Sequence, residues 1–240
     1  MILIMLKKML GDLRRIPEID RTWLVIWCVI YISFLGLDIV APQFWGATVI
    51  KYAGIFLCLV YAYRKFSHDH LLILALLFTL LADTILVWTS WEVLGVYAFC
   101  FAQFFHTARF TRSHPKFLIF YFLAIFLMFA FAILQGVSPI YAIAVIYALS
   151  LLTNLALSFS WFSHDRNNFR ARCAFYGFIL FVACDLSVAT QHLILDGLLP
   201  MAILPVASYL VWLFYYPSQV LISNSSNLAK PSVAKKERVG

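Results

Sequence analysis

Charged side chains are scarce in this chain. Only 12% of its 240 residues are Asp, Glu, Lys or Arg, about half the share usual in a soluble domain, while 64% are hydrophobic. No polar connection is long enough to fold into a separate soluble domain. These two deficits exclude a soluble globular protein and predict an integral membrane protein.

Polar segments that interrupt the apolar sequence are also few. The apolar stretches between them are long enough to cross a bilayer. A hydrocarbon core roughly 30 Å thick needs about 20 mostly apolar residues per helix. Helices are expected because lipid offers the backbone no hydrogen bonds, and because the alternation typical of barrel strands is missing. We predict an all-α polytopic membrane bundle, one domain over residues 1–222, with about eight transmembrane helices near 23–39, 47–63, 70–88, 92–110, 116–135, 138–160, 173–193 and 198–222.

Basic residues are missing from every second connection. The connections around 41–46, 90–92, 135–138 and 196–200 contain no Lys or Arg. All but Lys51 of the 18 Lys and Arg fall on the other side, which predicts that both termini are cytoplasmic. The net charge of +7 is then an orientation signal and an attraction to anionic membrane lipid, and no nucleic acid partner is expected. Residues 223–240 are predicted to be a disordered basic tail, and the short connections suit a bacterial inner membrane.

Metal-binding patterns are absent as well. The five cysteines show no CxxC spacing and are interpreted as small core residues. His106 and His192 lie toward opposite faces of the membrane, with no third ligand at their depth. We therefore expect no metal and no cofactor. The sequence leaves the oligomeric state open.

A few ionisable residues lie inside the predicted spans, where each costs about 2.5–3.5 kcal/mol at the bilayer centre. The most prominent are Asp83 and Asp185, each some distance from the cytoplasmic start of its helix. Their similar depth allows them to face one cavity. They lie 102 residues apart, which is four spans, so the halves 1–110 and 116–222 are candidates for a parallel repeat.

Each of these polar positions also has a structural interpretation. The two aspartates could hold helices together by bonding to hydroxyls or to Lys51, and Lys51 could extend toward the outer surface. His106 falls close to the cytoplasmic end of its span. Polar residues at helical spacing, either helix contacts or a wet cavity, run along two other spans as Tyr147, Ser150, Asn154 and Ser158, and as Tyr209, Tyr216 and Gln219.

Taken together, the chain resembles the YhhN-like lysoplasmalogenase family of eight-span membrane proteins. The matching positions, in order, are Lys51, Phe78-x4-Asp83, Gly95-x3-Phe99-x6-His106, Tyr147, Phe181-x3-Asp185-x3-Ala189 and Tyr216-Pro217-Ser218-Gln219-Val220-Leu221-Ile222. Three positions depart from the family pattern: Ala82 replaces Gly, Arg109 stands where Tyr is common, and Ser218 where Ala is common.

The resemblance implies hydrolysis of the vinyl-ether bond of lysoplasmalogens to a fatty aldehyde and a glycerophospho-base. Asp83 and Asp185 would be the acid and base, with Asp185 as a first guess for the acid. Lys51 would keep its neighbour ionised or bind the phosphate of the lysophospholipid. The remaining substrate contacts would come from His106, Tyr147, Asn154, Tyr216 and Gln219.

A transporter or channel is the competing hypothesis. There the two aspartates would relay a proton or cation, with Lys51 as a switchable counter-ion. Such proteins usually contain a helix broken by Gly or Pro at mid-membrane, for which Pro205 is the only candidate.

Overall fold

The computed structural model describes residues 20–41 and 45–228, and this part of the chain is helical without strands. The long helices are α2 (Arg21–Val40), α3 (Trp45–Lys65), α4 (His70–Trp88), α5 (Glu92–Phe110), α6 (Pro115–Leu134), α7 (Pro139–His164), α8 (Phe169–Leu195) and α9 (Leu204–Ser223), with a 3-10 turn, η1 (Met201–Ile203), before α9. The predicted all-α bundle is confirmed, and each predicted span coincides with one helix. Two spans, 70–88 and 92–110, match α4 and α5 at both ends.

Seven of these helices are long and apolar enough to cross a membrane, and α5 is not among them. Its lower hydropathy comes from polar residues that point inward, because Gln103, His106, Thr107 and Arg109 are all buried. Helices α4 and α7 pack against α5 and cover these side chains. The fourth predicted span is therefore a helix of the bundle whose polar side is hidden from lipid.

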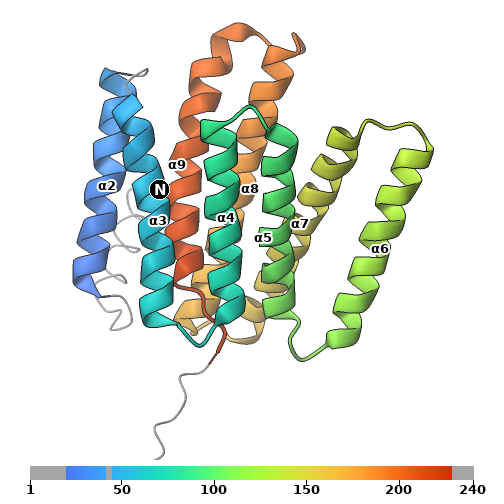
Figure 1. The fold of residues 1–240 in the computed structure, drawn as a ribbon. Helices are drawn as coiled ribbons and strands as arrows, with labels where there is room; N and C mark the ends of the chain where they lie inside the picture. The colour runs from blue at the N-terminus through green and yellow to red at the C-terminus, as the bar shows by residue number, and fades with distance from the viewer. Residues whose placement is uncertain (1–19, 42–44, 229–240) are drawn as a thin grey trace, which may run out of the picture.

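Consecutive helices run in opposite directions, so the start of α2 and the end of α9 lie at one end of the bundle (Figure 1). Arg64 and Lys65 close α3 at that end, and the α5–α6 and α7–α8 connections carry more basic residues there. We call this the basic end. Four N-terminal basic residues that were assigned to the same side lie outside the described residues: Lys7, Lys8, Arg14 and Arg15. Residues 42–44 and 229–240 also lie outside them.

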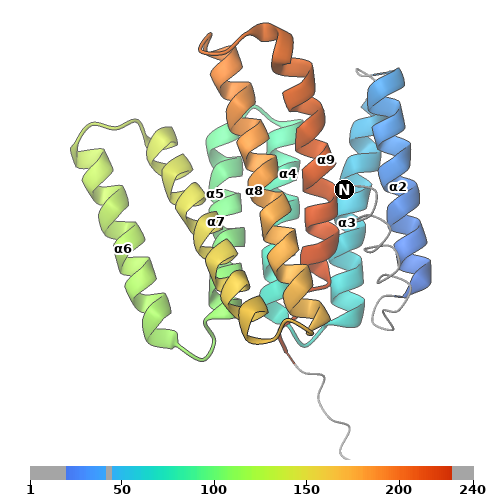
Figure 2. The same ribbon diagram turned by 180° about the vertical axis from the view of Figure 1, so that it is seen from behind.

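The helices repeat as two sets of four. Helix α2 packs on α3 as α6 packs on α7, and α3 on α4 as α7 on α8. Helix α4 packs on α5 as α8 packs on α9, and the cross-contact of α3 with α9 matches that of α7 with α5. Helices α4 and α8 overlap at the middle of both views, with α4 in front in Figure 1 and α8 in front in Figure 2. This arrangement supports the predicted parallel repeat and gives Asp83 and Asp185 corresponding helices.

The two ends of the row differ in packing. Helix α2 contacts α3 and α9, and its Trp27 and Phe34 are buried in the main core. Helix α6 has no buried residue, packs mainly on α7, and stands apart from the other helices (Figure 2). The outer helix of the first half, α2, is thus packed into the core, whereas the outer helix of the second half, α6, is loosely packed.

Pro217 lies inside α9 and cannot donate a backbone hydrogen bond to the carbonyl of Leu213. The Tyr31 hydroxyl of α2 donates to that carbonyl at 2.8 Å instead. The Tyr31 ring also stacks on Tyr216, with centroids 5.6 Å apart. The hydrogen bond that Pro217 cannot make is therefore replaced by one from Tyr31. This bond connects α2 to α9 and leaves the carbonyl of Leu213 paired.

The residues that follow α9 differ from the prediction of a disordered tail. Asn224, Ser225 and Ser226 are buried at the basic end. The buried Arg109 donates from Nη1 to the carbonyl and hydroxyl of Ser225, at 3.2 and 3.1 Å, and Ser226 Oγ donates to Asp69 at 2.8 Å. Asp69 also pairs with Arg112 at 2.6 Å. Residues 224–228 are therefore folded onto the bundle, where they supply hydrogen bonds to the buried Asp69 and Arg109.

Candidate active site

Asp83 lies in the last third of α4, away from the basic end, and is 8% exposed. The Tyr215 hydroxyl of α9 donates a 2.6 Å hydrogen bond to Asp83 Oδ2. Short hydrogen bonds from a hydroxyl to a carboxylate are among the stronger ones in proteins. The interaction favours an ionised Asp83, since a donor directed at a carboxylate stabilises its negative charge.

Asp185 lies in the second half of α8 and has different surroundings. Its Oδ2 is buried without a hydrogen-bond partner among the described residues. The Tyr147 hydroxyl of α7 interacts with the same carboxyl group. A buried carboxyl oxygen that lacks a donor favours the neutral acid, because a proton removes the cost of burying the charge.

The two carboxyl groups belong to one cluster without being in direct contact. The Cys184 thiol interacts electrostatically with both, and Tyr215 interacts with Tyr147. Phe99 and Phe181 fill the space between the tyrosines, since Phe99 contacts Tyr147 at 5.7 Å and Phe181 contacts Tyr215 at 5.7 Å between ring centroids. We call Asp83, Asp185, Tyr147, Tyr215 and Cys184 the acid cluster.

Lys51 is buried beside the acid cluster but pairs with another acid. Its Nζ lies 2.7 Å from Asp38 Oδ2 of α2 and 5.0 Å from the Trp212 ring centroid. Trp212 in turn contacts the Tyr215 ring at 5.5 Å. The alternatives of direct pairing with Asp83 and of extension to the surface are therefore not what the structure shows.

A hydrogen bond between the residues that follow Lys51 and Asp83 holds α3 against α4 near the acid cluster. The Tyr52 hydroxyl and the Thr84 hydroxyl lie 2.8 Å apart, and these residues directly follow Lys51 and Asp83. The positive charge and the Asp83 carboxyl are thus held on adjoining helices, in the half of the bundle away from the basic end.

His106 and Asn154 lie toward the basic end, outside the acid cluster. His106 lies near the end of α5, as predicted, but its ring is 1% exposed and contacts Phe178 at 5.2 Å, so it points into the bundle. The Asn154 amide donates to the carbonyl and side-chain oxygens of Gln103, both at 2.9 Å, and accepts from Thr107 at 3.0 Å. Asn154 therefore joins α7 to α5.

Tyr216 and Gln219 are buried on α9 and face the helices rather than the acid cluster. The Tyr216 hydroxyl and Gln219 Oε1 have no hydrogen-bond partner within residues 45–228 or 20–41. Gln219 Nε2 donates weakly to Ser218 at 3.3 Å. Both groups retain the capacity to bond to water or to a polar ligand.

Two residues of this site were not singled out from the sequence. Tyr215 was missed because its neighbour Tyr216 belongs to the polar stripe, although a hydroxyl one position away faces a different helix. Asp38 was not singled out because it falls near the end of the span predicted at 23–39. A buried Lys at matching depth, in the neighbouring span, is the signal that could have identified it.

The described residues contain no group of three or more His, Cys, Asp or Glu side chains placed to hold a metal ion. The acid cluster does contain a pair of carboxyl groups in contrasting surroundings. Asp83 Oδ2 receives a short hydrogen bond, whereas Asp185 Oδ2 has no hydrogen-bond partner among the described residues. Such a pair can divide the tasks of proton donor and proton acceptor.

The fold and the two intramembrane acids place this chain in the general class of polytopic helical membrane proteins. Its family follows from sequence comparison: the profile of the YhhN family matches residues 46–226, and the chain belongs to that family. No curated protein and no solved structure shows significant similarity to the chain.

Proposed function

We propose that this protein hydrolyses the vinyl-ether bond of lysoplasmalogens, releasing a fatty aldehyde and a glycerophospho-base. The observation that carries the proposal is the contrast between Asp83, which accepts the Tyr215 hydrogen bond, and Asp185, whose Oδ2 lacks a donor among the described residues. Membership of the YhhN family, which the sequence analysis linked to lysoplasmalogenases, adds support.

Cleavage of a vinyl ether begins with protonation of its outer alkene carbon. In the proposed scheme the neutral Asp185 donates this proton, and the alkene becomes an oxocarbenium ion. The ionised Asp83 stabilises the cation and takes a proton from the water that attacks it. The product of this step is a hemiacetal, with Asp83 protonated and Asp185 ionised.

Collapse of the hemiacetal restores both carboxyl groups. Asp185 takes the hydroxyl proton as the aldehyde forms, and Asp83 returns its proton to the departing glycerol oxygen. The net reaction consumes one water and needs neither an oxidant nor a cofactor. Tyr215 and Tyr147 act as positioning residues, since each holds one of the two carboxyl groups.

Lys51 supplies positive charge on the same side of the bundle. Held by Asp38 and the Trp212 ring, it would attract the phosphate of a lysophospholipid toward Asp83. Tyr216 and Gln219 would bond to water or to the head group through the groups left without partners. His106 and Asn154 are assigned support of α5 in this proposal.

The test is aldehyde release from a lysoplasmenyl ethanolamine lipid by the purified full chain in detergent. We expect release by wild type and a loss of about 10²–10⁴-fold in Asp83→Asn and in Asp185→Asn, the range contributed by a positioned acid or base. Asp196→Asn, which changes an exposed acid after α8, serves as the matched control. Full activity in either cluster variant, or none in folded wild type, would contradict the proposal.

A further inference from the structure

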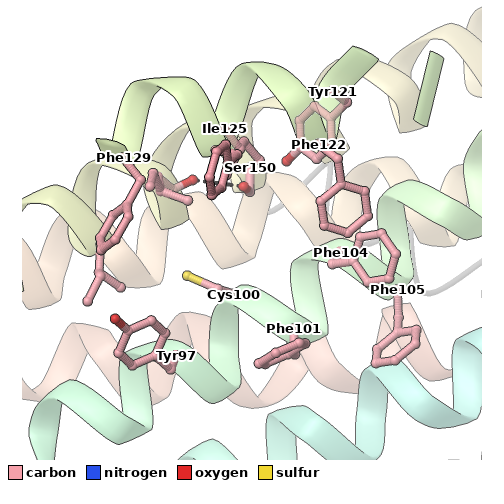
Figure 3. A pocket seen from close by; sticks show the side chains of 13 residues that line it. Tyr97, Cys100, Phe101, Phe104, Phe105, Tyr121, Phe122, Ile125, Phe129 and Ser150 are labelled. Atoms are coloured by element: carbon pink, nitrogen blue, oxygen red, sulfur yellow. Dashed lines mark hydrogen bonds between the residues drawn. The ribbon is translucent and has the colours of Figure 1, made fainter. Parts of the chain in front are cut away.

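A cavity of about 500 Å³ lies between α5, α6 and α7 (Figure 3). Its volume falls within the roughly 300–1,000 Å³ typical of small-molecule sites. Its walls are aromatic and aliphatic side chains, including Phe101, Phe104, Phe122 and Ile146. None of its lining residues carries a charge, so a polar or ionic ligand would lose its hydration without compensation.

The cavity opens where the bundle faces the hydrocarbon of the bilayer. Helix α6 forms one wall although none of its residues is buried. Its contact with α5 includes the ring pair Phe104–Phe122, with centroids 4.5 Å apart, and Figure 3 shows the two rings facing each other. This pair joins α6 to α5 at the wall of the cavity.

The corresponding space in the first half of the repeat is filled. There α2, α3 and α9 take the places of α6, α7 and α5, and between them lie Phe34, Trp212 and Tyr216 with the Lys51–Asp38 pair. The opening is therefore not a general consequence of the fold. It accompanies the looser packing of α6 in the second half.

The cavity adjoins the acid cluster. Cys100 lines the cavity and interacts electrostatically with Tyr147, which interacts in turn with Asp185. On α7, Ile146 and Ser150 line the cavity while Tyr147 between them contacts Phe99. At the other side Tyr97 also lines a shallower hollow with Ser90 and Glu92, next to the α4–α5 turn. Tyr97 therefore lies between the apolar cavity and a polar part of the surface.

We propose that this cavity binds the hydrocarbon chain of a single-chain membrane lipid, which enters laterally between α5 and α6. The inference deepens the proposed function, since a chain held there leaves its ether end beside Tyr147 and Asp185. Binding of the chain needs no catalysis, so it can be tested separately.

The probe is radiolabelled 1-O-hexadecyl lysophosphatidylethanolamine, a saturated ether that vinyl-ether chemistry does not cleave. Its equilibrium binding is measured with the full chain in phosphatidylcholine nanodiscs. Ile146→Trp and Ser150→Phe fill the cavity from α7 and are expected to weaken binding by about tenfold or more. Leu149→Trp, on the lipid-exposed face of the same helix, is the matched control and should leave binding within about twofold.

A second readout leaves the cavity walls unaltered. Cys100 lines the cavity, whereas Cys28 is exposed on α2. The saturated lipid should slow maleimide labelling of Cys100 and not that of Cys28, as read by peptide mass spectrometry. Equal labelling rates with and without lipid would overturn the proposal, as would unchanged binding in both filling variants.

The two proposals fail in different ways. Cavity-dependent binding of the saturated lipid without aldehyde release from a vinyl ether would refute the proposed reaction and retain the cavity site. Aldehyde release that is unaffected when the cavity is filled would refute the cavity site and retain the reaction.

Discussion

Tyr215 donates to Asp83 at 2.6 Å in the interior of the bundle, where water is scarce. A hydrogen bond to a charged group contributes about 1.5–3 kcal/mol, and its loss leaves a buried carboxylate without a donor. The function of Asp83 as a base depends on this bond in our scheme, because the bond holds the group ionised and in place.

Tyr215→Phe is therefore expected to reduce the rate of aldehyde release by about 10- to 100-fold while the protein stays folded. Tyr176→Phe, which alters an exposed tyrosine of α8, should change the rate little. The measurement is kcat and KM of both variants across pH. A pH–rate profile identical to that of wild type in Tyr215→Phe would show that the hydroxyl does not set the charge of Asp83.

Asp69 presents a different electrostatic case at the basic end, just before α4. Burial alone would raise the pKa of its carboxyl, but Arg109, the Ser226 hydroxyl and Arg112 together outweigh burial and hold the pKa below its ordinary value. A lowered folded-state pKa means that Asp69 contributes stability above its unfolded pKa near 4. That contribution is lost as pH falls through the folded-state pKa.

Asp69→Asn is expected to lower the free energy of unfolding by roughly 3 kcal/mol near pH 7, because Arg109 is then buried without its acid. The difference from wild type should shrink as pH falls below about 4, where the carboxyl of the unfolded chain becomes protonated, and should vanish below the lower folded-state pKa. Thermal unfolding in detergent at several pH values measures this. A difference that is constant with pH would show that the effect is not electrostatic.

At the scale of elements, close approach of α8 and α9 depends on a residue without a side chain. A Cβ at Gly177 would lie 2.8 Å from Ile222 Cγ1 and 3.2 Å from the Ile222 backbone nitrogen. The side chain of Ile222 can turn away, but the backbone of α9 can yield only if the helix moves. Small residues at such positions are typical of membrane helix contacts.

Gly177→Ala is thus expected to destabilise the protein by about 1–3 kcal/mol, the usual cost of overpacking. Gly36→Ala in α2 is the control, because a Cβ there meets nothing within 4 Å and alanine favours the helix. Thermal unfolding of both variants in one detergent provides the comparison. Equal or greater stability of Gly177→Ala would mean that α8 and α9 separate without cost.

For the whole molecule, the chain direction of the helices decides which surfaces share a side of the membrane. The end of α9 and the α3–α4, α5–α6 and α7–α8 connections lie together. Arg64 and Lys65 close α3 there, and Arg112 and Arg166 lie in the other two connections. By the positive-inside rule we predict that this end is cytoplasmic. The acid cluster then lies nearer the opposite surface.

A C-terminal green fluorescent protein fusion expressed in a bacterium should fluoresce, while alkaline phosphatase at the same position should be inactive. Insertion at Ser90, in the α4–α5 connection, should give the reverse pattern. Active phosphatase at the C-terminus would place the basic end outside and overturn the predicted orientation.

The eight predicted spans each coincide with one helix, seven of which are long and apolar enough to cross a membrane, while the pairing of polar residues was not predictable. Lys51 and Asp83 have similar depths, so the sequence allowed them to pair, yet Asp38 lies closer because α2 packs on α3. In the same way Asn154 was a candidate for substrate contact and instead joins two helices. Depth follows from position along a helix, whereas the direction that a side chain faces depends on helix rotation.

By itself, the amino-acid sequence determined that this protein is a helical membrane bundle with buried acids on two corresponding spans. Lipid forces every long apolar stretch to satisfy its own backbone, so hydropathy suffices for that result. Only the tertiary structure decided that Tyr215 bonds to Asp83, that residues 224–228 cover Asp69 and Arg109, and that a cavity lies beside α6. These features depend on contacts between segments far apart in the chain, which no local pattern encodes.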